Sequence, residues 1–285
     1  MAKSRSKMST WGWAMLAASL LPCTAGAQTI GEPLPPWSPG VLDIHQIGTG
    51  RGNAALLVFP DGTSLLVDAG DGNPNPPAGA NRVPDGSRSA GEWIARYARR
   101  MLSHQADPAI DYGLITHFHG DHMGGLGPAT PTEPGGEYRL TGITDVASHM
   151  PIRTMLDRGW PDYTYPRPLD NAMMDNYRAF LEVEGARRGM TVERIEPGRA
   201  DQIVLRHDPD RYPNFTVRNI AANGEVWTGA GDGTHNHFPA LADIPREDWP
   251  TENECSIAIR VSYGAFDFYT GGDMPGQPAP GLPAW

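Results

Sequence analysis

Cysteine is scarce in this sequence. Only two of the 285 residues are cysteines, and only Cys255 lies beyond the first 27 residues. One remaining thiol cannot form an internal disulfide, so the fold must be stabilised by its core and by any bound metal. The sequence also has no internal repeat of the solenoid type. These absences exclude disulfide-rich scaffolds and repeat architectures.

Long apolar runs are absent as well. The apolar stretch at residues 11–21 is too short to span a bilayer comfortably. Three basic residues precede it and small residues follow it up to Ala27, which is typical of a secretory signal peptide over residues 1–27. A lipoprotein attached through Cys23 fits less well, because Pro22 stands where a small residue is expected. We therefore predict an exported protein, periplasmic or secreted, with no transmembrane segment after signal cleavage.

Basic residues are outnumbered by acidic ones. The 23 Lys and Arg face 33 Asp and Glu, which gives a formal net charge of −10, and loss of residues 1–27 would take it to −13. No basic stripe is present, and a net acidic protein is poorly suited to following a nucleic-acid backbone. We expect a small-molecule or phosphodiester substrate and no nucleic-acid track. The sequence does not indicate an oligomeric state.

Glycine and proline are plentiful. Their 34 and 28 residues indicate a loop-rich chain, and an apolar content of 39% indicates that it folds. Residues 28–40 are especially rich in proline and predict an extended lead-in. Residues 41–285 predict one large domain with a core of its own.

An α/β pattern opens this domain. A strand, an amphipathic helix and another strand succeed one another at residues 64–70, 91–102 and 111–117, which is typical of a βαβ unit. Asp61-Gly62 lies between two apolar runs and predicts a hairpin. Further strands are predicted at residues 41–48, 54–60, 215–222, 255–264 and 265–273, and a second helix at residues 170–189.

Three of the nine histidines fall within six positions of the stretch THFHGDHMGG, residues 116–125. His117 and His119 are two apart, so in an extended segment they point the same way and can hold one metal ion. Asp121 and His122 can turn toward a second ion, since the glycine before them permits a tight turn. A surface histidine cluster with chance metal affinity is the alternative, but the preceding strand and the following glycines favour a built site.

The donor set of this stretch indicates the metal. Imidazole nitrogens with one carboxylate suit zinc, and also iron or manganese. Two such ions about 3.5–4 Å apart can share a bridging hydroxide, which is a nucleophile at neutral pH. We therefore expect two divalent metal ions, with zinc favoured.

The His117-x-His119-x-Asp121-His122 motif resembles the signature of the metallo-β-lactamase superfamily. The resemblance implies an αββα sandwich with the metals at one edge, between two sheets. It also implies an activity within a group that includes lactamases, glyoxalase II, lactonases, phosphodiesterases and nucleases.

Two segments extend the resemblance. Residues 42–70 are similar to the opening of the extracytoplasmic metallo-β-lactamase-like domain of competence (DNA-uptake) proteins, including its Gly-x-Gly turn, hairpin and Asp68-x-Gly70 ending. Residues 253–273 are similar to the later hairpin of the same group, which ends in Gly-Asp. By this resemblance, Asp273 bridges the two metal ions.

The chain departs from the superfamily pattern in two places. Lactamases and glyoxalases supply a histidine from a Gly-His turn, where this chain has TENE at residues 251–254. The first metal then has two histidines plus shared ligands, and β-lactam hydrolysis is disfavoured. The superfamily also places a last histidine well after the Gly-Asp turn, whereas this sequence ends twelve residues beyond Asp273. We expect a sandwich truncated at its C-terminal part. Residues 126–252 match no pattern.

These observations favour an exported metal-dependent hydrolase acting on a phosphodiester or an ester, with Asp121 orienting the nucleophile. A lactone or ester hydrolase is the alternative within the same class. A non-catalytic metal-binding protein with an incomplete ligand set is the alternative from another class.

Four further features are candidates for the site. Asp68 ends a strand near the expected metal loop and is predicted to orient one of the first two histidines of the motif. His235 and His237 form a second spaced pair, either a substitute ligand pair or part of an exposed loop. His149 is a candidate pocket residue, and residues 158–166 either flank a substrate pocket or cover the core.

Overall fold

The computed structural model describes residues 30–72 and 81–275. The predicted signal peptide lies outside the described residues. Residues Pro36–Trp285 group into one compact unit and Met1–Pro35 into another, and the fold below is that of the larger unit. None of the helices in the described part of the chain has the length and apolar content that crossing a membrane requires.

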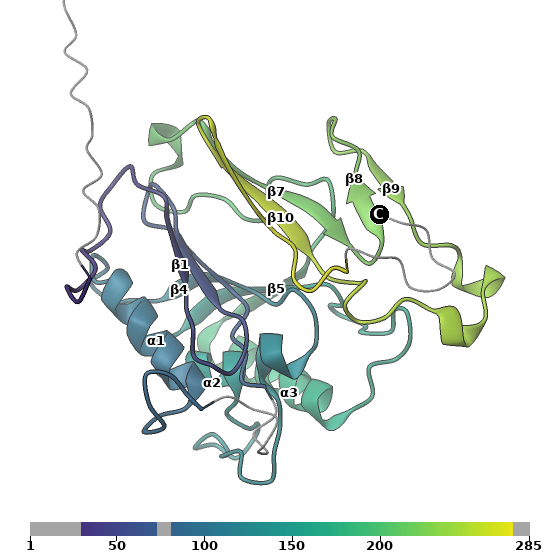
Figure 1. The fold of residues 1–285 in the computed structure, drawn as a ribbon, viewed down its shortest axis with the longest axis horizontal. Helices are drawn as coiled ribbons and strands as arrows, with labels where there is room; N and C mark the ends of the chain where they lie inside the picture. The colour runs from purple at the N-terminus through teal and green to yellow at the C-terminus, as the bar shows by residue number, and fades with distance from the viewer. Residues whose placement is uncertain (1–29, 73–80, 276–285) are drawn as a thin grey trace, which may run out of the picture. The chain divides into compact units, whose positions relative to one another are not determined.

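The first sheet has six strands in the order β1-β2-β3-β4-β5-β6 (Figure 1). β1, β2 and β3 pair antiparallel, and the β2–β3 pairing confirms the hairpin predicted at Asp61-Gly62. β3 and β4, on either side of the predicted helix, pair parallel, which confirms the predicted βαβ unit. β5 and β6 continue the parallel pairing and were not predicted from the sequence. The strands are β1 Asp43–Gln46, β2 Ala55–Val58, β3 Ser64–Val67, β4 Ile110–Leu114, β5 Ile152–Asp157 and β6 Thr191–Arg194.

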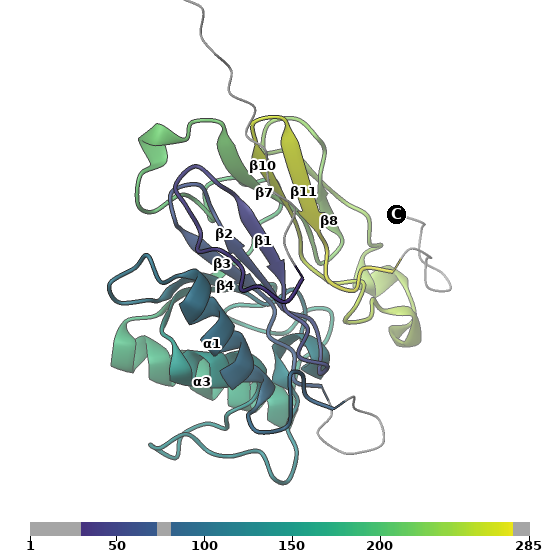
Figure 2. The same ribbon diagram turned by 60° about the vertical axis from the view of Figure 1, so that its left-hand side comes forward.

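Helices α1 (Ala90–Met101), α2 (Gly142–His149) and α3 (Ala172–Arg188) cover the outer face of this sheet (Figures 1 and 2). Ser89 caps α1, because its hydroxyl accepts the backbone N–H of Glu92 at 3.1 Å. α1 and α3 confirm the two predicted helices. α2 was not predicted from the sequence.

The second sheet is antiparallel, in the order β11-β10-β7-β8-β9. Its strands are β7 Phe215–Ala222, β8 Glu225–Trp227, β9 Thr234–Asn236, β10 Ala258–Tyr263 and β11 Phe266–Thr270. β7, β10 and β11 fall within the predicted strands, whereas β8 and β9 were not predicted. Short helical turns occupy Gly120–Gly124 (η1), Pro209–Arg211 (η2), Leu241–Asp243 (η3) and Arg246–Asp248 (η4).

The hydrophobic core lies between the two sheets. Alternate residues of each strand point into it, so Leu57 faces the second sheet while its neighbour Leu56 is buried on the opposite side of the strand. The principal contributors are Leu57, Leu65, Tyr112, Leu114 and Leu156 from the first sheet and Val217, Ile257, Ile259 and Val261 from the second or its approach. This arrangement is the predicted α/β architecture of two facing sheets with helices outside.

Strand directions bring several loops to one edge of this sandwich. The carboxyl ends of the parallel strands β3 to β6 share an edge of the first sheet. β7 and β11 both run antiparallel to β10, so their carboxyl ends share an edge of the second sheet. The backbone N–H of Ile257 donates to the carbonyl of Thr116 at 2.9 Å and joins the two edges there.

Candidate metal centre

The histidine motif, residues 116–125, forms the loop that follows β4 at this shared edge, and we call it the metal loop. A single turn of π-helix, η1, follows His119 and carries Asp121 and His122. Backbone hydrogen bonds fix the loop, because Asn53 N–H donates to the carbonyl of Asp121 at 2.8 Å and Ala69 N–H donates to that of His122 at 2.7 Å. The loop is thus held by backbone groups on either side of the β2–β3 hairpin.

Two glycines make that close approach possible. A Cβ added to Gly70 would lie 1.9 Å from the carbonyl oxygen of Asp121, and one added to Gly52 would lie 2.2 Å from it. Neither position tolerates a side chain without moving the metal loop. The Asp68-x-Gly70 sequence therefore carries a packing constraint as well as a carboxylate.

Three potential ligand atoms converge beside this loop. His117, His122 and Asp273 each offer one ligand atom, and the three atoms lie within 4.8 Å of one another. The Nε2 of His122 is 3.1 Å from Oδ1 of Asp273, and the rings of the two histidines are 4.0 Å apart. Both histidines are fully buried, whereas the Asp273 side chain is 37% exposed. The group joins the loop after β4 to the segment after β11.

His119 adjoins this group from the solvent side. Its Nδ1 lies 3.0 Å from Nε2 of His117, so the two imidazoles converge as their spacing predicts, although His119 is exposed. Asp121 is also exposed, and within the described residues it is not among the three converging ligands. Its charge nevertheless acts on His122, whose pKa it helps to raise.

Asp68 orients His122. Its Oδ2 accepts the Nδ1–H of His122 at 2.8 Å, which leaves Nε2 of that ring for a metal ion. The same carboxylate accepts the backbone N–H and the hydroxyl of Thr116, each at 2.8 Å. The expectation that Asp68 orients one of the first two histidines was therefore wrong, because Thr116 and His122 occupy its acceptor positions.

The pKa values of the two buried histidines shift in opposite directions. Burial, together with the charges of His122, His119 and Arg158, lowers the pKa of His117 to about 3. Burial also acts to lower the pKa of His122, but the hydrogen bond and charge of Asp68 outweigh it, with help from Asp273, and this pKa lies above its ordinary value. His117 is thus a neutral imidazole across the physiological range, as a metal ligand must be.

An ion pair between Glu252 and Arg158 contacts the metal loop, and the sequence did not predict it. Glu252 accepts the backbone N–H of Phe118 at 2.7 Å and the Nε–H of Arg158 at 2.8 Å. Arg158 is the largest fully buried side chain described and also donates to Asn223 Oδ1 at 3.0 Å. The TENE segment therefore braces the metal loop through Glu252.

Unpartnered polar atoms also surround the ligand group. The Oδ1 of Asn253 and the hydroxyl of Ser256 are buried and make no hydrogen bond of normal geometry within the described residues. Asn253 lies close enough to His117 to act on its pKa. A Cβ on Gly272 would come within 2.9 Å of Ser256 Oγ, so this segment packs tightly beside Asp273. The neutral imidazole of His117 and the carboxylate of Asp273 are donors that fit zinc.

The other candidate histidines lie elsewhere. The rings of His235 and His237 are 4.8 Å apart, but β9 is four strands from β11, or about 19 Å at the usual strand spacing. His149 ends α2, pairs with Asp145 at 3.3 Å, and lines a cavity of about 360 Å³ against α1. Neither position belongs to the group beside the metal loop.

Residues 158–166 serve both of the roles considered for them. Tyr163 is buried and donates its hydroxyl to Asp157 at 2.8 Å, as a core residue does. Tyr165, two residues later, lines a cavity of about 510 Å³. The aromatic loop therefore seals the core on one side and forms a cavity wall on the other.

Comparison with known proteins agrees with this geometry. Residues 47–139 match the family model described as the metallo-beta-lactamase superfamily. The chain is also similar to the lactamase-like protein vrtG of Penicillium aethiopicum, with 25% identity over 116 residues, which are 41% of this chain and 30% of that protein. The chain thus matches less than a third of this relative's length. The family match contains β2 to β4 and the whole metal loop, and the two-sheet α/β architecture of the structure is consistent with the fold of that superfamily.

Proposed function

We propose that this protein is an exported metal-dependent hydrolase that acts on a phosphodiester or an ester. The observation that carries the proposal is the convergence of ligand atoms of His117, His122 and Asp273 within 4.8 Å. The two histidines follow β4 inside the family match, and Asp273 joins them from outside it. Hydrolases that use divalent metal ions are the usual members of this superfamily. The signal-peptide pattern of residues 1–27 supports export.

We infer a site for two divalent ions. His117, His122 and Asp273 would hold them, with His119 and Asp121 completing the set on the solvent side. Zinc suits these donors best, and manganese or iron also accept them. When bound, such ions activate water at neutral pH and polarise the oxygen of the attacked group.

The chain's own groups prepare this chemistry. Asp68 fixes the ring of His122 and its tautomer, and burial keeps His117 neutral. Glu252 fixes the backbone between His117 and His119 by holding Phe118 N–H. Asp121 is exposed beside the ligand group, a position from which a carboxylate can orient the attacking water and take its proton.

Phosphodiester chemistry is favoured by the resemblance of residues 42–70 and 253–273 to the competence-type domain. The net charge of −10 disfavours a long nucleic acid as substrate, so a small phosphodiester is the first choice. Esters and lactones are the second, because the same activated water attacks a carbonyl carbon.

The test is hydrolysis by protein purified without a histidine tag and loaded with zinc. We expect cleavage of bis(p-nitrophenyl) phosphate or p-nitrophenyl acetate, and His122→Ala should reduce the rate about 1,000-fold, as loss of several kcal/mol of metal catalysis implies. His149→Ala is the matched control, since it removes an imidazole from outside the site. A wild-type protein that binds two zinc ions and cleaves no phosphodiester, ester or lactone would be a metal-binding protein instead. Export is checked by the mass of the mature N-terminus, expected at Gln28.

A further inference from the structure

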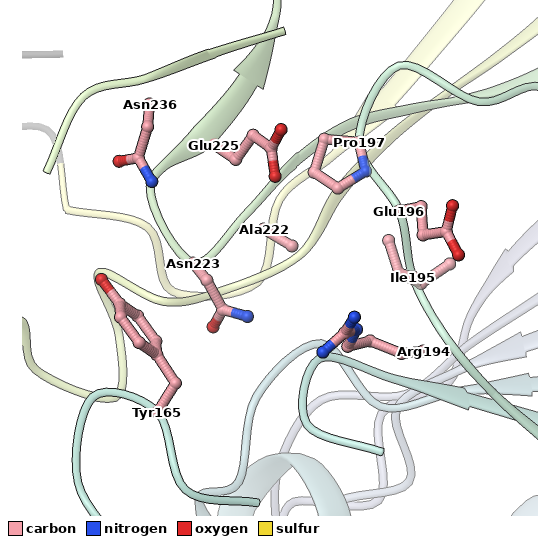
Figure 3. Close-up of a pocket in the computed structure, with 9 residues that line it drawn as sticks. All are labelled: Tyr165, Arg194, Ile195, Glu196, Pro197, Ala222, Asn223, Glu225 and Asn236. Carbon is pink, nitrogen blue, oxygen red and sulfur yellow. The ribbon is translucent and has the colours of Figure 1, made fainter. Parts of the chain in front are cut away.

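A cavity of about 510 Å³ opens at the same edge of the sandwich as the metal loop. Figure 3 shows its walls, which come from the aromatic loop, the segment after β6, the β7–β8 turn and β9. This volume lies within the range of small-molecule sites. Its polar lining residues are Tyr165, Arg194, Glu196, Asn223, Glu225 and Asn236.

Strand pairing places one wall of this cavity two strands from the metal loop. Leu114 of β4 pairs with Leu156 of β5, and Asp157 of β5 pairs with Arg194 of β6. The cavity wall on β6 is thus two strands from the loop that carries His117, or about 10 Å at the usual spacing. In the second sheet, β7 contributes to the cavity wall and is likewise two strands from β11, which precedes Asp273.

The charged groups of the lining are not equivalent. Glu196 pairs with Arg199 at 3.1 Å, and Figure 3 draws its carboxylate turned away from the opening. Glu225 accepts the hydroxyl of Thr234. Arg194 points its guanidinium into the opening, and within the described residues this guanidinium has no hydrogen bond or ion pair. Its charge is therefore available to a ligand.

Two neutral donors complete this set. The hydroxyl of Tyr165 has no hydrogen-bond partner among the described residues. Asn236 uses its Oδ1 to accept Phe238 N–H at 2.8 Å, which leaves its amide N–H groups toward the cavity. Asn223 is not available to a ligand in the same way, because both polar atoms of its side chain are hydrogen-bonded to Arg158. Its Oδ1 accepts from the guanidinium, and its Nδ2 donates to the backbone carbonyl. Arg194, Tyr165 and Asn236 thus place hydrogen-bond donors on three walls of the cavity, and the Arg194 donor is charged. Such a set of donors suits an anionic oxygen group.

We propose that this cavity binds an anionic group, carboxylate or phosphoryl, at the end of the substrate remote from the bond that is cleaved. This inference rests on the proposed hydrolase function and adds a specificity determinant to it. The substrate then carries its anionic group about 10 Å from the reacting centre, the distance between the metal loop and β6. Arg194 binds the anion, and Tyr165 and Asn236 donate to its remaining oxygens.

A pair of esters of equal length tests the proposal. The mono-p-nitrophenyl ester of octanedioic acid carries a terminal carboxylate that can span two strand spacings, and p-nitrophenyl octanoate lacks it. For the charged ester we expect Arg194→Ala to raise KM about tenfold with kcat within about twofold, since a charge-assisted hydrogen bond is lost. KM for the neutral ester should not change. Arg96→Ala, which removes the same charge from the helical layer, is the control for net charge.

The outcomes separate this inference from the proposed function. Equal effects of Arg194→Ala on both esters, or no effect on either, would overturn the subsite. If the wild type cleaves neither ester, the ester function fails and calorimetry with octanedioate decides on the subsite alone. Binding that is about tenfold weaker in Arg194→Ala supports the subsite, and equal binding contradicts it.

Discussion

The two sheets contribute very different halves of the metal centre. The first sheet supplies His117 and His122, which are fully buried, and His122 is hydrogen-bonded to Asp68, which Thr116 holds in turn. The second sheet supplies Asp273, 37% exposed, from the end of a hairpin whose Phe266 and Tyr269 are 52% and 57% exposed. The histidine half is preorganised before metal binds, whereas the carboxylate half lies where the chain can adjust. We therefore expect metal affinity and fold stability to be coupled at the histidines of the first sheet and separable at Asp273.

The buried pair under the metal loop is where we expect that coupling to be largest. Glu252→Gln removes the partner of Arg158, whose side chain is 1% exposed, and leaves a buried charge uncompensated. The free energy of unfolding should fall by about 3–5 kcal/mol. Urea denaturation of the metal-free protein measures this. Arg199→Ala is the control, because it breaks an exposed pair worth at most about 1 kcal/mol. Equal losses of unfolding free energy in the two variants would contradict a stabilising role for the Glu252–Arg158 pair beyond that of an exposed pair.

Asp68→Asn should come second in size. The amide keeps the shape of the carboxylate but no longer holds His122 as a charged acceptor. Zinc affinity should fall about 10- to 100-fold, as for other residues that orient a ligand histidine. Competition with a chromophoric chelator measures it, with Asp43→Asn as the control because Asp43 lies only 3.9 Å from a different histidine, His45. Unchanged affinity would show that Asp68 serves the fold alone.

Asp273→Asn tests the carboxylate that the second sheet contributes to the metal centre. Zinc affinity should fall about tenfold, since one ligand is weakened, while the free energy of unfolding of the metal-free protein should change by less than about 0.5 kcal/mol. The same chelator competition and urea denaturation check both values. A loss of more than about 1 kcal/mol in the metal-free protein would mean that the second sheet's half is as tightly built as the first.

The smallest effect is expected far from the site, in the hairpin of the first sheet. Burial acts to raise the pKa of Asp61, but the backbone N–H groups of Thr63, His207 and Asp208 outweigh it and lower this pKa below its ordinary value. A lowered carboxylate pKa stabilises the fold at pH values above the ordinary value of about 4, and this stabilisation is lost as pH falls through the folded value. Asp61→Asn should therefore cost less than about 1 kcal/mol at pH 7, and this difference in stability should narrow as pH falls below the ordinary value of about 4. A gap that stays constant from pH 7 to pH 3 would show that the charge of Asp61 contributes nothing.

Much of the first sheet could be predicted from the sequence. The hairpin at Asp61-Gly62, the helix at Ala90–Met101 and the loop of His117 and His122 carry strong local signals, namely turn chemistry, apolar period and ligand spacing. Asp273 was predicted through family resemblance, and the structure brings it beside His122. Local pattern suffices where neighbours in sequence are neighbours in space.

Other elements and contacts could not be predicted, because they are short or form between residues far apart in the sequence. α2 has only eight residues and β8 and β9 only three each, too short to show a period. Glu252 and Arg158 are 94 positions apart, and nothing local indicates that they meet under the metal loop. The cavity beside Arg194 likewise arises from four separate segments, so only the folded chain reveals it.

Metal content tests the central claim most directly. Mass spectrometry of the tag-free protein should find close to two zinc ions per chain in the wild type and in a His235→Ala, His237→Ala double variant, which removes the imidazole pair on the other sheet. A His117→Ala, His122→Ala double variant should retain almost none. The metal centre is contradicted if the wild type holds no more metal than that variant. It is also contradicted if the His235→Ala, His237→Ala variant loses its metal while the His117→Ala, His122→Ala variant keeps it.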